Sequence, residues 1–462
     1  MPETTSAQAN TGTNTDLRRE LGLASATALV AGECIAVGIF LTPAGMAKAL
    51  GSPMWLLLVW LAVGAMTMTG ALCYGELASR FPRAGGGYVY LQEAFGRRLA
   101  FLYGWMCLLV MDPGLTASLA TGTAAYAAYI FHWPPVVIKV AGVVAIWSLC
   151  GLNILSVRLS AGLMRWITWL KLGLLGLLTV WAVVFHLGSW SNFFPFVAQR
   201  PGSLALGPAL GVGMVAAFYS FGGWWEVSRI AGEVRDPGRT LQRAMILGVL
   251  LVTAIYVFVS GIFLYLVPLE KVASDETFVA QVGAILFEPA GGIVFAAIVV
   301  VCVLGSLAGF VMAAPRVYYA MAKDGLFLPA VARLQPRFGT PAWAIAIHGA
   351  IGTLLVAVSS FQQIIAYFIF AAVLFLGLTV AGLFPMRSKS KDAGTAILTP
   401  GYPVTPLIFL SFVGLMLVVL ALHAPRESAL GVMVVLAGVP VYEVFQRRRT
   451  QPLVHQIPEE AN

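Results

Sequence analysis

Three ionisable side chains, Glu33, Asp112 and Lys171, fall inside long apolar stretches of this sequence. A charge within the hydrocarbon of a bilayer is costly, so such residues are rare, need a partner and often have a functional role. Glu33 and Lys171 have opposite signs and could form a structural ion pair between two helices. Alternatively, Lys171 supplies a coupling charge, and Glu33 contacts a solute amine, titrates, or does both. For Asp112, which precedes Pro113, we favour a structural role.

The elements that carry these residues are apolar stretches of about 20 residues, each long enough to cross a bilayer as a helix. Hydrophobic residues make up 59% of the chain and charged residues only 10%, which is typical of polytopic helical membrane proteins. We therefore predict an all-α polytopic membrane protein with twelve transmembrane helices, at about residues 22–50, 54–78, 98–129, 135–154, 160–186, 206–230, 240–267, 289–320, 341–360, 362–386, 401–423 and 427–446.

The basic residues alternate between loops that carry many of them and loops that carry few. Of the 28 Lys and Arg residues, 22 fall in the two tails and every second loop, with Arg229 and Arg316 counted among them. Positive charge is retained on the cytoplasmic face. Both termini are therefore predicted to be cytoplasmic, in a multi-pass protein of the cell membrane, and Lys171 is predicted to be the one cation inside the bilayer.

Two spans contain clusters of helix-breaking residues, namely Gly32, Gly38, Pro43 and Gly45 in the first and Gly211, Gly213, Gly222 and Gly223 in the sixth. Glycine destabilises a helix interior by about 1 kcal/mol relative to alanine, so we predict that both helices are discontinuous, with close helix packing as the alternative. The two spans occupy corresponding positions if residues 20–186 and 206–386 are inverted five-helix repeats, and such paired interruptions mark the binding site of many transporters.

A broken helix has a specific chemistry. Its half-helix N-terminus presents unpaired N–H groups that favour an anion, and its free carbonyls suit an ammonium. A solute that carries both groups, such as an amino acid, matches a site made from two such breaks. This reasoning favours an amphoteric solute and does not identify its side chain.

Other functional classes lack support in the sequence. The five His residues are scattered, and the sequence has no metal-ligand cluster, no nucleophile–base arrangement and no phosphate loop. We therefore expect no enzyme, no metal site and no cofactor. The spread of basic residues over short loops does not indicate nucleic acid. All five Cys residues fall in apolar stretches, so none is evidently placed to bond an obligatory partner chain.

Several segments resemble the amino acid–polyamine–organocation superfamily, most closely its L-type amino acid transporters, over about residues 17–390. The most specific is YGELASRFPRAGGGYVYLQEAFG at 74–96, which is similar to the family pattern Y-x-E-L-x-x-x-x-P-x-x-G-G-x-Y-x-Y. GECIAVGIFLTPAGMA at 32–47 resembles G-x-x-I-G-S-G-I-F, and FYSFGGWWEVSRIAGEVRDPGRTL at 218–241 resembles F-x-Y-G-G-W…E-E-x-x-x-P.

This resemblance implies a LeuT-type fold of 5+5 inverted repeats with discontinuous first and sixth helices. It implies a transporter core at 17–390, two additional helices within 400–446, and cytoplasmic tails at 1–16, expected to be disordered, and 447–462. The implied activity is sodium-independent secondary active transport of amino acids by alternating access, through exchange or proton coupling. Lys171 falls on the family lysine, where other transporters of this architecture place a coupling sodium.

The resemblance also implies the residues of the site. Substrate would contact the first span at Ile35, Ala36, Val37 and Gly38, and the sixth at Tyr219, Ser220, Phe221 and Gly222. Tyr219 would cover it from outside, and Glu233 and Arg83 would act at an inner gate.

Three positions depart from the family pattern. Ala36-Val37-Gly38 replaces the family's G-S-G, and Val373 stands where L-type relatives often have a large aromatic residue. Glu33 replaces a neutral residue, which could favour a cationic substrate or proton coupling. A polyamine or other organic-cation carrier is therefore an alternative. A non-transporting amino acid sensor is another, although it would need a longer cytoplasmic segment than tails of about 16 residues.

Overall fold

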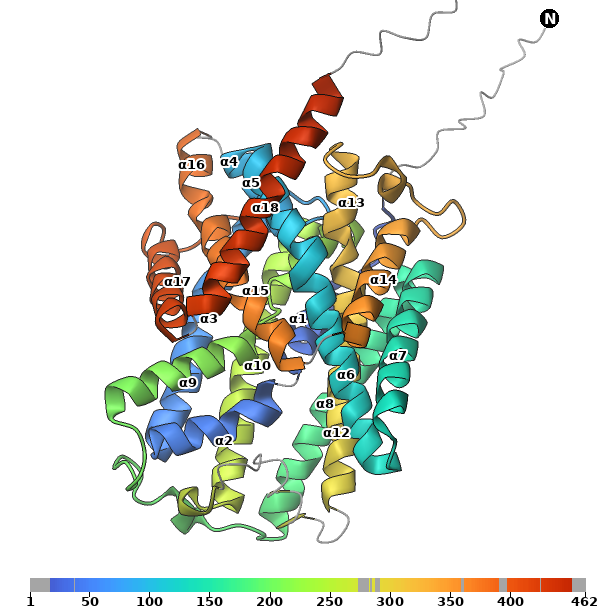
Figure 1. Cartoon of the computed structure of the whole chain (residues 1–462). Coiled ribbons are helices and arrows are strands. Elements are labelled where there is room, and N and C mark those ends of the chain that lie inside the picture. Colours follow the sequence, from blue (N-terminus) through green and yellow to red (C-terminus); the bar gives the residue numbers. More distant parts are fainter. Residues whose placement is uncertain are drawn as a thin grey trace, which may run out of the picture.

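The chain folds into a bundle of helices (Figure 1). The computed structural model describes residues 17–36, 38–272, 282, 285–286, 291–358, 361–389, 397–423 and 425–450, and within these ranges it contains no β-strand. The predicted tail at 1–16, Val37, and residues 451–462 of the second predicted tail lie outside the described residues. The helix before that tail runs on to Thr450, beyond the predicted end at 446.

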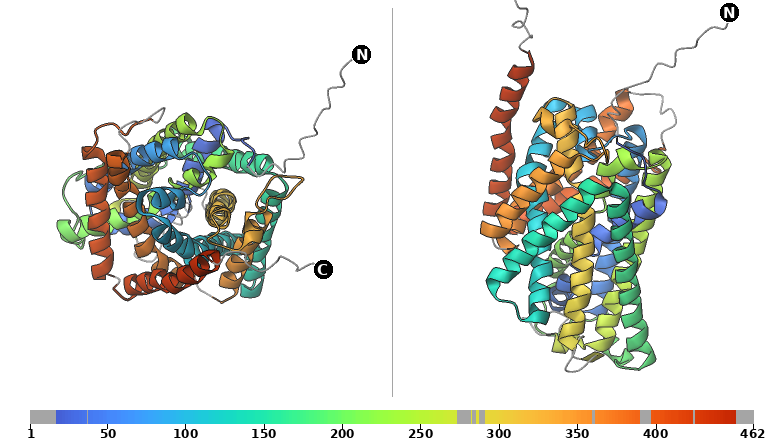
Figure 2. Two further views of the ribbon diagram at one scale, coloured as in Figure 1. Left: turned by 90° about the horizontal axis from the view of Figure 1, so that it is seen from above. Right: turned by 90° about the vertical axis from the view of Figure 1, so that its right-hand side faces the viewer.

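The helices of the first half are α1 (Leu23–Cys34), α2 (Gly38–Leu50), α3 (Pro53–Arg80), α4 (Gly87–Phe95), α5 (Arg97–Met106), η1 (Cys107–Met111), α6 (Asp112–Phe131), α7 (Pro135–Leu155), α8 (Val157–Val184) and η2 (Trp190–Phe193). Those of the second half are α9 (Leu206–Phe221), η3 (Glu226–Glu233), α10 (Pro237–Leu266), η4 (Leu269–Lys271), α12 (Gly291–Ala313), α13 (Pro315–Lys323), η6 (Pro329–Ala332), α14 (Ala342–Val358), α15 (Phe361–Ala381) and α16 (Leu383–Lys389). The last two are α17 (Val404–His423) and α18 (Pro425–Thr450), which lie at the edge of the bundle when it is viewed from above (Figure 2).

Ten helical stretches of the described residues are long and apolar enough to cross a membrane. The other two of the twelve predicted spans contain shorter apolar helices, α1 and Ala342–Ala357 of α14. Large apolar side chains such as Leu159, Trp166 and Leu177 are more than 60% exposed on the outside of the bundle. Exposing such an apolar surface is unfavourable in water but not against lipid chains, so the protein is an integral, multi-pass membrane protein.

The first and sixth spans are both interrupted, as predicted. The α1 helix ends at Cys34 and α2 begins at Gly38, while α9 ends at Phe221 and continues after a turn as the 3₁₀ helix η3. Only some of the predicted breakers act as such. Pro43 lies inside α2. Gly213 lies inside α9, where a Cβ would come within 3.2 Å of Leu50.

A third irregularity was not predicted. The span that begins at Arg97 contains a π-helical turn, η1, directly before Asp112 and Pro113. Proline has no N–H, so it removes one intrahelical hydrogen bond, and local π turns can re-satisfy backbone groups freed in this way in membrane helices. The turn brings Asp112 to the centre of the bundle, where it is fully buried.

Glu76 connects three distant parts of the chain on one side of the bundle. Its buried carboxylate, on α3, accepts hydrogen bonds from Arg80 Nε at 2.9 Å and from Arg387 Nε of α16 at 3.0 Å. It also accepts the backbone N–H of Thr399, before α17, at 2.8 Å. A single carboxylate thus fixes α16 and the start of α17 against α3.

Glu76→Ala should lower the free energy of unfolding by about 1.5–3 kcal/mol, because it leaves charged donors of two arginines unpaired. The measurement is the unfolding midpoint of purified protein in detergent. Glu93→Gln is the control, since Glu93 pairs with Arg83 at an exposed surface and should change stability by less than about 1 kcal/mol. Equal losses in the two variants would contradict this account.

Candidate functional site

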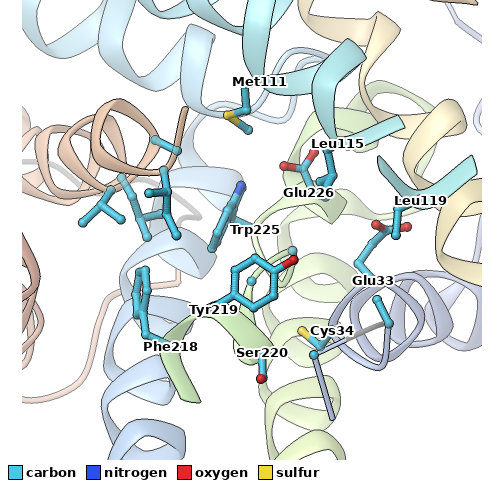
Figure 3. Close-up of a pocket in the computed structure, with 18 residues that line it drawn as sticks. Glu33, Cys34, Met111, Leu115, Leu119, Phe218, Tyr219, Ser220, Trp225 and Glu226 are labelled. Carbon is cyan, nitrogen blue, oxygen red and sulfur yellow. The ribbon is translucent and has the colours of Figure 1, made fainter. Parts of the chain in front are cut away.

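A cavity lies in the middle of the bundle, where the two interrupted helices meet α6 and α15 (Figure 3). The volume open to the centres of water molecules is about 100 Å³, several times the ~10–15 Å³ that one water requires. Its walls are mostly apolar. It is lined by Glu33, Cys34, Ala36, Gly38, Met111, Leu115, Leu119, Phe218, Tyr219, Ser220, Gly222, Gly223, Trp225, Glu226, Ile369, Ala372, Val373 and Leu376.

Lys171 fills the gap left by the end of α1. Its fully buried ammonium donates to the carbonyl oxygens of Gly32 at 2.7 Å and of Ile35 at 2.9 Å. Ser306 of α12 lies 2.5 Å from the same Gly32 oxygen and 3.4 Å from the ammonium. The last carbonyls of a helix have no intrahelical partner and carry its negative dipole end. The lysine therefore neutralises a helix end that would otherwise be unpaired.

Tyr256 of α10 links the two interrupted helices. Its hydroxyl oxygen lies 2.5 Å from the carbonyl oxygen of Cys34 and 2.7 Å from that of Ser220, and it shares one proton between them. The Cys34 thiol donates in turn to the carbonyl of Phe221 at 3.2 Å. Carbonyls at the ends of both α1 and α9 are thus held by groups of the protein.

The two breaks also touch directly through glycine. A Cβ at Gly38 would lie 2.7 Å from the Cα of Ser220, and one at Gly223 would lie 2.7 Å from the Cβ of Glu33. Gly223 also has a φ of +104°, which side chains other than hydrogen rarely allow. These glycines permit the close approach of the two chains, and α2 begins at this contact with N–H groups that lack intrahelical acceptors.

Glu33 lies against the cavity without a partner for one of its oxygens. Its side chain is 6% exposed, and Oε1 has no hydrogen-bond partner. The ion pair with Lys171 that the sequence left open is not formed, because the ammonium donates to carbonyl oxygens and Ser306. The two side chains do have opposite signs, but the lysine donates its hydrogen bonds to backbone carbonyls instead of to Glu33.

A buried charge cluster adjoins the cavity and was missed from the sequence. Arg229 of η3 is fully buried, with Nη1 2.9 Å from Asp112 and Nε 2.9 Å from Glu226. Tyr318 of α13 also donates to Asp112 at 3.0 Å. The expected structural role of Asp112 is consistent with this pairing. A signal for Glu226 was available, since it follows the Gly222–Gly223 break by three residues.

Arg229 and Arg316 were counted among the basic residues of the predicted cytoplasmic side. Both side chains are fully buried in the bundle, so Lys171 is not the only buried cation of the described residues. Loop-based counting did not reveal this burial, because each arginine lies in a helix that continues past the apolar stretch and each pairs with carboxylates, which lowers the cost of burying the charge.

Most of the predicted site residues come together. Glu33, Ala36, Gly38, Tyr219, Ser220, Gly222 and Val373 line the cavity. Ile35 and Phe221 are buried behind it, where their carbonyls accept from Lys171 and Cys34. Val37 lies outside the described residues.

The two expected inner-gate residues pair with different partners. Glu233 is buried and accepts two hydrogen bonds from Arg316 of α13, at 2.8 and 3.2 Å. Arg83 instead pairs with Glu93 at the surface. Glu233 therefore joins η3 to α13, a contact that the sequence pattern did not reveal.

The comparisons with known proteins agree with this arrangement. Residues 21–441 match the family described as amino acid permease. The chain belongs to this family. Membership, together with the relatives described next, confirms the resemblance to the amino acid–polyamine–organocation superfamily and its L-type transporters, and makes the protein a transporter rather than an enzyme.

Three relatives are similar along nearly the whole chain of this permease. The serine/threonine exchanger SteT of Bacillus subtilis (strain 168) is 28% identical over 439 residues, covering 94% of this chain and 98% of the relative. The b(0,+)-type amino acid transporter 1 of Homo sapiens is 30% identical over 445 residues, covering 95% and 90%. The large neutral amino acids transporter small subunit 2 of Homo sapiens is 29% identical over 438 residues, covering 92% and 80%.

Among the described residues, no group of three or more His, Cys, Asp or Glu side chains could hold a metal ion. The Cys residues are buried and unpaired. One relative is by name a small subunit, so the absence of a heavy-chain partner stays a prediction.

Tyr256→Phe should weaken solute uptake and lower the free energy of unfolding by about 1–3 kcal/mol, because it leaves two buried carbonyls unsatisfied. Uptake into proteoliposomes and the unfolding midpoint would be measured on the same preparation. Tyr129→Phe, at a side chain that is 60% exposed, is the matched control. Unchanged uptake in Tyr256→Phe would show that the link between the breaks is dispensable.

Proposed function

We propose that this permease carries amino acids across the cell membrane by sodium-independent secondary active transport. The observation that carries the proposal is the meeting of two interrupted helices at a central cavity. The printed names of the relatives, an exchanger and two amino acid transporters, favour the same class of solute.

The two helix breaks offer complementary charge to an amino acid. The first N–H groups of α2, from Gly38 onward, have no intrahelical acceptors and lie at a positive dipole end, so they suit the carboxylate. The carbonyls of Tyr219, Ser220 and Phe221 at the end of α9 each accept one hydrogen bond from the protein. Each keeps a second lone pair, so they suit the amine. Tyr219 lines the cavity beside them, in a position to cover the solute.

Lys171 would replace a coupling sodium. Backbone carbonyls and a hydroxyl are the ligands that a hard cation takes from a protein, and here an ammonium occupies that environment permanently. The charge that stabilises the end of α1 therefore belongs to the chain, and transport would proceed by exchange or with a proton.

Alternating access would require the interrupted helices to move against their neighbours. We propose that α1–α8 and α9–α16 form two inverted repeats, with α17 and α18 outside them, and that both termini are cytoplasmic. The buried pairs of Arg229 with Asp112 and of Arg316 with Glu233 join η3 to α6 and α13. They would close one side of the cavity and separate when it opens.

Replacing sodium with choline should leave uptake unchanged. The measurement is uptake of labelled amino acids into proteoliposomes, with and without unlabelled amino acid inside. A rate that rises with sodium would refute the proposed role of the lysine, and failure to take up any amino acid would refute the function.

Lys171→Ala should reduce uptake by at least about tenfold, because two carbonyls at the end of α1 lose their cation. Membrane insertion would be checked by the yield of monodisperse protein. Lys139→Ala is the control, since Lys139 is exposed and donates only to the carbonyl of Ala357. Equal uptake in the two variants, across a range of pH, would rule out a coupling role.

A further inference from the structure

Two carboxylates face the same cavity from opposite breaks. Glu33 is in the last turn of α1, and Glu226 is the first residue of η3. Figure 3 shows the hydroxyl end of the Tyr219 ring directed toward the side where both acids lie. The rest of the lining is mostly apolar, so the acids are its main charged features.

The cations nearby are already engaged. Lys171 donates to the carbonyls of Gly32 and Ile35, and Arg229 is shared between Glu226 and Asp112. The three carboxylates of Glu33, Glu226 and Asp112 exceed the two cations by one negative charge, and Oε1 of Glu33 is buried without a hydrogen bond. A buried carboxylate without a partner is strongly unfavourable, so a ligand that brings a cation would be stabilised here.

An ordinary zwitterion would not supply that cation. In the proposed function, on which this inference rests, its carboxylate and amine are taken by the backbone at the two breaks. We propose that the solute is a dibasic amino acid, whose side-chain ammonium or guanidinium lies between Glu33 and Glu226.

The walls fit the stem of such a solute. Met111 of η1 and Leu115 and Leu119 of α6 line the cavity next to the two acids. A long methylene stem with a charged end is stabilised by apolar contacts along its length and by carboxylates at its tip. Val373 leaves room that a large aromatic side chain would fill.

The test compares solutes in one preparation of the full-length protein. Proteoliposomes loaded with unlabelled amino acids are given labelled arginine or lysine, labelled leucine or serine, or labelled putrescine, a diamine without a carboxylate. The readout is the ratio of kcat/KM for the dibasic solute to kcat/KM for the neutral one. Partial loss of folded protein lowers both values by the same factor, so this factor cancels in the ratio. We expect a ratio of at least about ten.

The variants are Glu33→Gln and, independently, Glu226→Gln, so that the failure of one to fold leaves the other. Each should reduce the ratio by about tenfold or more while neutral amino acids are still taken up. Glu443→Gln, at an exposed position of α18, is the matched control and should leave the ratio unchanged.

The remaining outcomes separate this inference from the proposed function. If neutral amino acids are taken up and dibasic ones are not, the inference is overturned and amino acid transport stands. If Glu33→Gln leaves the ratio intact but removes pH-driven accumulation, Glu33 carries a proton and the inference is again overturned. If putrescine alone is taken up, or no solute is, both statements are wrong.

Discussion

Unpaired backbone groups at two helix breaks are the constraint on which the rest of this structure depends. In a bilayer, water cannot satisfy a free N–H or C=O, so irregular backbone is tolerated only where the protein or a cavity supplies partners. Lys171 and Ser306 hold the carbonyls at the end of α1, and Tyr256 holds one carbonyl from each break. The buried polar side chains around the site are explained largely by this requirement.

The partners are distributed unequally between the two kinds of backbone group. Side chains from α8, α10 and α12 engage carbonyls at the ends of α1 and α9, whereas the first N–H groups of α2 lie beside the cavity. The positive end of a helix dipole thus borders the cavity, and the negative end of α1 is neutralised by a lysine. A site built in this way would receive an anionic group at α2, and its two acids, Glu33 and Glu226, would be available to a second cationic group of the solute.

The sequence predicted the parts of the fold that depend on local pattern. The apolar stretches predicted the helices, and the glycine clusters predicted both breaks, because helix propensity and hydrophobic length depend on the local sequence. Gly211, Gly213 and Pro43 were misleading, since a glycine that permits close packing and one that permits a turn look alike in sequence. Pairing is a tertiary property, so neither the engagement of Lys171 by carbonyls nor the burial of Arg229 and Arg316 followed from spacing.

The buried arginines fix η3 against its neighbours. Arg229 joins η3, which begins at the cavity with Glu226, to Asp112 at the π turn before α6, and Arg316 joins Glu233 at the other end of η3 to α13. Removing one partner of a buried pair costs more than the pair contributes, because the other charge remains buried. η3 is therefore held at its middle, by Arg229, and at its end, by Glu233, through contacts that can separate only if water or another charge replaces them. A solute cation near Glu226 would compete with Arg229 for that carboxylate, and would thus act on the residue that joins η3 to Asp112.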